Sequence, residues 1–250
     1  MTTAFTPPAL VAPPAPADPT PRQAARLAGL SYFVLFGLAI FANFFVREGL
    51  VVADDAAATA ANIAESEGLF RLGLVSFLMI FLLDVVVAWA LHIVFRDTNR
   101  DLSRLSAWFR LTYTVLLGVA TLFFFQALQL LSGADFLSAL GSGPVEAQAL
   151  VALETFNSAW LIGLAAFGVH LALLGVLVVQ AAQTSRALGW LGRLLVIAGV
   201  AYLVDTGAHA LLGNYADYEG LFTTIVVVPA VIAELWLGLW LFLRGGGHSA

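Results

Sequence analysis

The chain has 250 residues, of which 61% are hydrophobic and 11% are charged. One core could not bury so much apolar surface in a chain of this length, so the composition excludes an ordinary water-soluble domain. The net charge of −5 comes without a basic stripe that could neutralise phosphates, which argues against nucleic-acid binding. Cysteine and lysine are both absent, which excludes disulfides, Cys-ligated metals, thiolate nucleophiles and a lysine Schiff base.

The first feature along the chain is a proline-rich tail. Seven of the nine prolines lie within residues 1–21, a composition that cannot form a helix or a core. We therefore predict a disordered cytoplasmic tail over residues 1–21, a membrane domain over 22–244 and a short cytoplasmic tail over 245–250. The tail lacks the basic n-region of a signal peptide, so the first apolar segment is expected to act as an uncleaved signal anchor.

Six long apolar segments follow the tail. Each is near or above the ~20 residues that a helix needs to cross the hydrocarbon core of a bilayer. Because a helix satisfies its own backbone hydrogen bonds, these segments predict an all-α membrane protein built as a six-transmembrane-helix bundle. The predicted spans are residues 27–46, 72–95, 107–131, 156–179, 188–212 and 221–243.

The charges between these segments predict an orientation. Arginines gather before the first segment, in the second and fourth loops and after the sixth segment, whereas acidic residues dominate the other loops. Since positively charged loops stay cytoplasmic, both termini are predicted to face the cytoplasm. The lipid bilayer is the partner that the sequence implies, and the sequence leaves open whether the chain forms a homo-oligomer or binds another membrane protein.

The first external loop predicts a short surface helix. Asp54 and Asp55 precede the alanine-rich stretch AAATAANIAESEG, which an aspartate can cap and Gly68 can end. Such a helix could form the lid or wall of a vestibule, or it could be a solvated connector.

Polar residues inside the spans are the candidates for a functional site, because a charge at the bilayer centre costs about 2.5–3.5 kcal/mol on insertion scales. Asp84, His170 and Glu234 come from the second, fourth and sixth segments. A rise of about 1.5 Å per residue places all three within roughly 4 Å of the midplane. They could meet in the bundle interior as a proton or small-solute site. The alternative is polar contacts between helices, worth ~0.6–2 kcal/mol each, which only fix helix packing.

Depth along the helices also predicts the counter-charge of Asp84. The same geometry places Arg110 about 13 Å nearer the cytoplasm than the midplane, close enough to snorkel to the inner surface. Arg71 lies about 20 Å from Asp84 along one helix, so neither arginine matches its depth. His170 is therefore the expected partner of Asp84.

Two further features lie near these candidates. Pro229 is the proline inside the sixth predicted span, close to Glu234, and it is expected to kink or loosen that helix. The fifth segment places Tyr202, Asp205 and His209 on one face of a helix. Asp205 and His209 could bind a metal only if further ligands joined them, so whether a metal binds is left open and a pair bonded to each other is the simpler interpretation.

Residues 22–244 resemble a bacterial family of integral membrane proteins known as domain of unknown function 4386. The resemblance rests on long ordered blocks, which are RLAGLSYFVLFGLAIFANFFVREGLVVADDAAATAANI, LFRLGLVSFLMIFLLDVVVAWAL, IGLAAFGVHLALLGVLV, LGWLGRLLVIAGVAYLVD and VVVPAVIAELWLGLWL. It implies a multi-span protein of a bacterial inner membrane, and it supplies no catalytic residue.

Three functions are consistent with the sequence. The first is small-solute or proton-linked permeation through a midplane site of Asp84, His170 and Glu234, with no cofactor. The second is a membrane scaffold or accessory subunit whose polar residues are structural. The third is an intramembrane metal-dependent enzyme that acts on lipid. The sequence carries no nucleophile–base motif, so an enzyme is the least favoured of the three.

Overall fold

The computed structural model describes residues 19–182 and 185–244, and helices make up most of this part of the chain. In order, the elements are α1 (Pro21–Ile40), η1 (Phe41–Arg47), α2 (Glu48–Leu50), α3 (Ala56–Glu65), α4 (Glu67–Phe95), α5 (Arg100–Leu130), η2 (Asp135–Leu140), α6 (Ser142–Ala181), α7 (Arg186–Leu211), η3 (Tyr215–Tyr218) and α8 (Glu219–Arg244). Within the described ranges, six helical stretches are long and apolar enough to cross a membrane. The prediction of an all-α membrane protein with six long apolar helices is confirmed.

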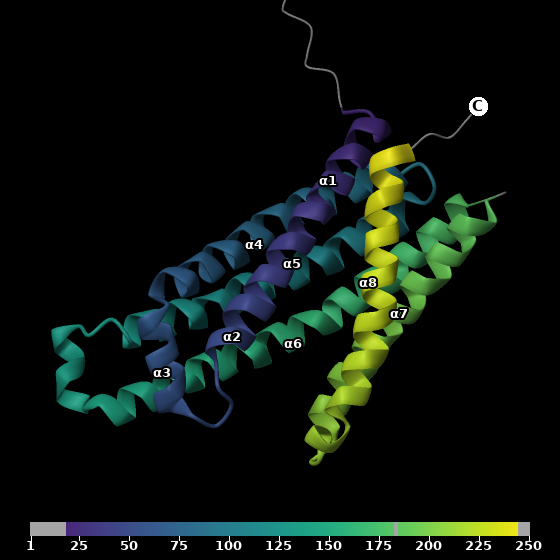
Figure 1. The fold of residues 1–250 in the computed structure, drawn as a ribbon. Coiled ribbons are helices and arrows are strands. Elements are labelled where there is room, and N and C mark those ends of the chain that lie inside the picture. The colour runs from purple at the N-terminus through teal and green to yellow at the C-terminus, as the bar shows by residue number, and fades with distance from the viewer. Residues whose placement is uncertain (1–18, 183–184, 245–250) are drawn as a thin grey trace, which may run out of the picture.

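The long helices form a closed ring that follows chain order (Figure 1). α1 packs on α4, α4 on α5, α5 on α6 and α6 on α7, and α8 closes the ring by packing on both α7 and α1. Because of this arrangement, one face of every long helix can reach the interior of the bundle. α1 begins and α8 ends at the same end of the bundle.

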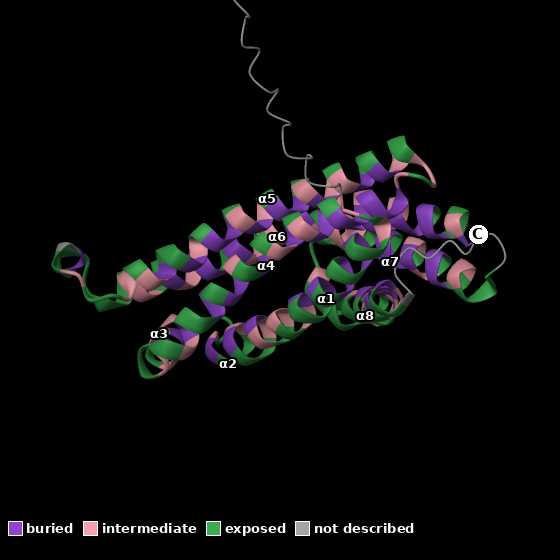
Figure 2. Cartoon of the chain, turned by 90° about the horizontal axis from the view of Figure 1, so that it is seen from above, coloured by how far each residue is buried: buried purple, intermediate pink, exposed green. Residues whose placement is uncertain are grey.

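Figure 2 shows exposed residues along the outer faces of the helices, and many of the exposed side chains are large and apolar. Large side chains such as Leu72, Leu122 and Ile162 are 57%, 62% and 61% exposed, respectively. A water-soluble protein would not leave so many apolar side chains uncovered, whereas a bilayer would cover them. The chain is a multi-pass membrane protein.

The first helix begins where the proline-rich tail ends. Thr20 caps α1, because its hydroxyl accepts a hydrogen bond from the Gln23 backbone N–H at 3.3 Å while the Gln23 side chain accepts from the Thr20 N–H at 3.0 Å. Pro21 occupies the first helical position, where its missing N–H costs nothing. Most of the predicted tail at 1–21, and all of the tail at 245–250, lie outside the described residues.

The short helix predicted in the first loop is present as α3 and packs on α6. The Asp55 carboxylate caps it by accepting a hydrogen bond from the Ala58 N–H at 2.8 Å. The predicted end of the helix was wrong, since Gly68 lies inside the first turn of α4. The chain turns at Ser66 instead, whose backbone leaves the helical conformation without needing a glycine.

The first span contains a π-helical segment, η1, which the sequence did not predict. The Asn43 amide donates to the Ala39 carbonyl at 3.0 Å, and Arg47 donates to the Asn43 and Asn157 side-chain oxygens at 3.3 and 3.1 Å. Asn157 belongs to α6, so the widened turn connects the end of the first span to a helix across the ring.

Aromatic rings fill the half of the bundle that lies away from the chain ends. Phe70 stacks on Phe124 with ring centroids 4.7 Å apart, and Phe156 lies 4.8 Å from Phe77 and 5.0 Å from Phe124. These four rings come from α4, α5 and α6 and are almost fully buried. They join the three helices into one packed unit.

Helices α6 and α7 cross at a seam of glycines. A Cβ atom at Gly168 would lie 2.7 Å from the Gly199 carbonyl oxygen, and one at Gly192 would lie 2.6 Å from the Gly175 carbonyl oxygen. Only glycine allows the two backbones to approach this closely.

Beyond this seam, α7 separates from α6. The buried residues of α7 end at Ala201, ten residues before the helix ends at Leu211. The hairpin of α7 and α8 then runs away from α5 and α6 toward its own tip (Figure 1). This divergence leaves space beside α8, at the level of the polar residues described next.

Candidate functional site

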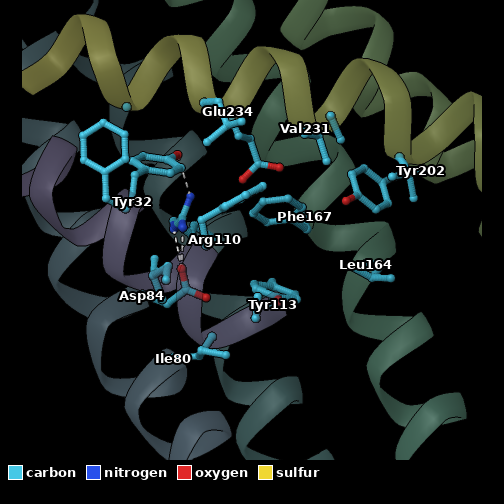
Figure 3. A pocket seen from close by; sticks show the side chains of 18 of the residues that line it. Tyr32, Ile80, Asp84, Arg110, Tyr113, Leu164, Phe167, Tyr202, Val231 and Glu234 are labelled. Atoms are coloured by element: carbon cyan, nitrogen blue, oxygen red, sulfur yellow. Dashed lines mark hydrogen bonds and ion pairs between the residues drawn. The ribbon is translucent and has the colours of Figure 1, made fainter. Parts of the chain in front are cut away.

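Arg110 of α5 is the centre of a buried polar network. Its Nε and Nη2 atoms both donate to Asp84 Oδ1 of α4, the first at 3.0 Å, and form an ion pair with it. Its Nη1 atom donates to the Tyr32 hydroxyl of α1 at 3.0 Å and to His170 Nε2 of α6 at 3.2 Å. Figure 3 shows Arg110 above Asp84 and beside Tyr32. Four of the five guanidinium N–H groups are therefore used.

The expectation that His170 is the counter-charge of Asp84, with Arg110 too far away in depth, was wrong. Arg110 is the partner, and both side chains are 3% exposed. The predicted span of 107–131 omitted the start of α5, which begins at Arg100, so the true midpoint of the helix is closer to Arg110. The long arginine side chain covers the remaining distance.

The hydrogen bonds of His170 are those of a neutral imidazole ring. Arginine can only donate, so the contact with Arg110 requires His170 Nε2 to accept and places the ring proton on Nδ1. His170 Nδ1 then donates to the Ser106 carbonyl oxygen at 2.9 Å, and the Ser106 hydroxyl lies 2.9 Å from the same nitrogen. His170 therefore orients Arg110 and carries no charge of its own.

The ion pair is stable in this environment because further hydrogen bonds from Arg110 to Tyr32 and His170 accompany it. Removing two charges from water is costly, and the cost is offset only when good geometry and further hydrogen bonds accompany the pair. The rings of Tyr32 and Phe167 add a second kind of support, with centroids 5.2 and 5.5 Å from the Arg110 guanidinium carbon. Asp84, Arg110 and His170 thus form a closed structural unit.

A cavity of about 210 Å³ lies beside this network, and residues of α1, α4, α5, α6, α7 and α8 line it. Its walls are mostly apolar. Polar side chains reach it from α1, α4, α5, α7 and α8, and these are Tyr32, Asp84, Arg110, Tyr113, Tyr202 and Glu234.

Glu234 of α8 is the charged residue of this cavity that the network does not include. Its carboxylate points from α8 toward the cavity, on the side of Arg110 away from Asp84 (Figure 3). Across residues 19–182 and 185–244, no ion pair or side-chain hydrogen bond includes this carboxylate. The side chain is partly exposed, so a small molecule can reach it from the cavity.

The three residues predicted to meet do come together. Asp84 and Glu234 line one cavity, and His170 contacts Arg110 in its wall. Their environments differ, since Asp84 and His170 both contact Arg110, and Glu234 has no ion pair or side-chain hydrogen bond among the described residues. Asp84 Oδ2 accepts no hydrogen bond among the described residues, but the charge of Asp84 is balanced by Arg110, whereas the charge of Glu234 is not balanced by any described side chain.

The family of the chain is shown by a comparison of sequences. A family model described as Domain of unknown function (DUF4386) matches residues 27–245, which cover the six long helices except for the first six residues of α1. The chain belongs to this family. A relative from Archaeoglobus fulgidus, described as an uncharacterized protein, is 27% identical over 172 residues, which cover 69% of this chain and 83% of that protein. No solved structure matches the DUF4386 chain.

The second group of candidates in this DUF4386 protein is only partly at the cavity. Tyr202 lines it, but Asp205 and His209 do not. The predicted bond between Asp205 and His209 was wrong, because Tyr215 from η3 folds back between them. Its hydroxyl donates to Asp205 at 2.7 Å, and its ring lies 3.5 Å from the His209 ring. In the described residues, no cluster of three or more His, Asp or Glu side chains could hold a metal ion.

Helix α8 of the DUF4386 protein continues through Pro229 without interruption. Val227 and Ala230, on either side of the proline, line the cavity. A proline deletes one backbone hydrogen bond, so the predicted loosening of this turn stays a prediction, now located in the cavity wall.

Sequence analysis did not select Tyr32, Ser106 or Tyr113 of the DUF4386 protein. A signal was present for two of them, because Ser106, Arg110 and Tyr113 are spaced three and four residues apart and share one face of α5. Tyr32 gave no signal, since a single uncharged tyrosine in an apolar span is equally compatible with packing.

Proposed function

We propose that this protein is a permease for a small solute or for protons, and that the cavity beside α8 is its binding site. The observation that supports this most is the unpaired carboxylate of Glu234. A carboxyl group without a partner in the interior of a membrane protein is costly, so its presence favours a role in binding. Asp84, Arg110 and His170 would form a rigid wall of this site, and Glu234 would bind the solute or proton.

In this proposal Glu234 alternates between a protonated and an ionised state. The apolar walls exclude water, and the neutral Asp84–Arg110 pair leaves the charge of Glu234 uncompensated. A proton or a solute that reaches the carboxylate removes that charge, and its departure restores it. This exchange would couple occupancy of the cavity to the packing of α8.

We further place both termini in the cytoplasm of a bacterial inner membrane. α1 begins and α8 ends at one end of the bundle, and the arginine-rich connections from Arg96 to Arg104 and from Arg186 to Arg193 lie at the same end because the helices alternate in direction. The acidic connections lie at the other end. This separation supports the positive-inside orientation.

The alternative of a scaffold or accessory subunit is favoured by one observation. The Arg110 network joins α1, α4, α5 and α6 through one ion pair and several hydrogen bonds, which is the arrangement expected of polar residues that only fix helix packing. The two proposals differ at Glu234, because a scaffold gives an unpaired carboxylate no role.

Proton flux in liposomes tests the proposal. Purified protein is reconstituted with a pH-sensitive dye inside, and a potassium diffusion potential drives proton entry. We expect flux above that of empty liposomes, and a loss of at least tenfold in Glu234→Gln. Glu219→Gln is the matched control, because Glu219 is an exposed residue at the start of the same helix and outside the cavity. Equal flux in wild type, Glu234→Gln and empty liposomes would contradict the permease.

A further inference from the structure

The walls of the cavity indicate which chemical class of solute it takes. We infer that the cavity binds a small lipophilic organic cation, such as a quaternary ammonium ion or a protonated amine. This inference rests on the proposed function, because it assigns a ligand to the same site.

The first argument is the charge balance of the cavity. Asp84, Arg110 and Glu234 are the lining residues with a formal charge, and the first two form an ion pair with each other. Ionised Glu234 therefore leaves one net negative charge. That charge would repel an anion. Arg110 could donate few hydrogen bonds to an anion, because four of its five N–H groups are already used. The cavity is complementary to a monovalent cation.

The second argument separates an organic cation from a metal ion. A hydrated metal ion gives up its water only where several oxygen atoms replace it. Here the other side-chain oxygen atoms of the lining belong to Asp84, which is paired with Arg110, and to tyrosines, of which Tyr32 and Tyr113 already accept hydrogen bonds. The Glu234 carboxylate and few further oxygen atoms would therefore have to replace the hydration shell. An alkylammonium ion needs no such ligands, because its charge lies beneath methyl or methylene groups that gain from apolar contact.

The third argument is the aromatic lining. Phe36, Trp160 and Tyr202 line the cavity in addition to Tyr32 and Phe167, whose rings already contact the Arg110 guanidinium. Aromatic rings attract cations through their negative faces and recognise quaternary ammonium groups in this way. The lining thus provides one carboxylate and several rings, the two features that bind an organic cation.

The volume limits the size of the ligand. The cavity measures about 210 Å³, below the ~300–1,000 Å³ of sites for drug-sized molecules. Tetramethylammonium and tetraethylammonium are suitable probes. Trp160 in the wall provides an optical signal, since its fluorescence responds to a charge that arrives beside the ring.

The test is a fluorescence titration of purified protein in detergent at constant ionic strength. Tetramethylammonium and tetraethylammonium chloride are compared with sodium chloride, with tert-butanol as a neutral probe of similar size and with pivalate as an anionic one. We expect saturable changes with the two ammonium ions only. Glu234→Gln should weaken their binding at least tenfold, Glu234→Asp should retain the preference for cations, and Glu219→Gln should bind as wild type does. Trp160→Phe should lose most of the optical signal while calorimetry still detects binding.

Equal binding of pivalate or tert-butanol, or unchanged ammonium binding in a folded Glu234→Gln variant, would overturn the inference. Failure of this inference is distinct from failure of the permease. Proton flux that depends on Glu234, without ammonium binding, would overturn the ligand class and leave the permease standing. Ammonium binding through Glu234 in a protein without any flux would support the ligand class and contradict transport.

Discussion

Two polar regions lie side by side in this bundle, and they differ in whether their charges are paired. Around Arg110, side chains from α1, α4, α5 and α6 form an ion pair and hydrogen bonds that leave no net charge. On the side of α8, Glu234 faces a cavity without a partner. Charged residues at one level of a membrane protein are therefore not equivalent, and hydrogen-bond partners distinguish a structural group from one that can bind a ligand.

The packing of the helices explains this difference. α1 and α8 are in close contact near the chain ends, where a Cβ at Gly29 would lie 2.6 Å from the Phe242 nitrogen and one at Gly238 would lie 3.1 Å from the Tyr32 Cβ. The cavity opens next to this contact, since Tyr32 and Gly238 are also part of its lining. The close contacts fix α8 on α1 near the chain ends, and the divergence of the α7–α8 hairpin from α5 and α6 leaves space for the cavity beside α8.

The largest effect on stability is expected from removing one charge of the ion pair between Asp84 and Arg110. Asp84→Asn leaves Arg110 buried and without its counter-ion, which should lower the free energy of unfolding by about 3–5 kcal/mol. Arg110→Gln should cost a similar amount, because it leaves Asp84 unpaired. Unfolding of the purified protein in detergent, followed by circular dichroism, measures both.

The double variant Asp84→Asn/Arg110→Gln is the control for this prediction. With no uncompensated charge left, it should be more stable than either single variant. If the losses in the free energy of unfolding of the two single variants add in the double variant, Asp84 and Arg110 are not energetically coupled. The contrast between the Arg110 network and the cavity at Glu234 would then be wrong.

A smaller effect is expected at the glycine seam. A methyl group at Gly199 would meet the backbone of α6, including the Ala172 nitrogen at 2.7 Å, so Gly199→Ala must separate the helices and should cost about 1–3 kcal/mol. Gly207→Ala, later in the same helix, is the control because nothing lies within 4 Å of the added atom. Helix propensity predicts a neutral or stabilising effect there. Equal losses in both variants would show that the seam is no tighter than the free part of α7.

The fold was predictable because apolar length determines it. Six segments of sufficient length permit few arrangements in a bilayer, and Asp55 marked the start of α3 through ordinary capping chemistry. The π segment η1 was not predictable, since no local residue pattern distinguishes it from the α-helix around it. The end of α3 was missed because the chain can leave a helix at Ser66 without a glycine.

The sequence predicted which residues belong to the site, but it did not predict which of them are paired with each other. Asp84, His170 and Glu234 were found because charged or polar groups in a span avoid lipid, which directs them inward. The partner of Asp84 depended on where α5 begins and on the reach of the Arg110 side chain, and neither can be read from depth alone. The sequence therefore could not show that Glu234 is the residue left unpaired.

The smallest change in stability is expected for Glu234→Gln, and this variant decides whether the cavity beside α8 is a binding site or part of the structural core. Glu234→Gln removes a charge that has no partner in the described chain, so the free energy of unfolding should change by about 0.5 kcal/mol or less, or should rise. The measurement is the same unfolding experiment, at a pH where wild-type Glu234 is ionised in the unfolded chain. A loss as large as that of Asp84→Asn would mean that Glu234 stabilises the bundle as Asp84 does. The region beside α8 would then be structural as well, and the scaffold would replace the permease as the better account of the protein.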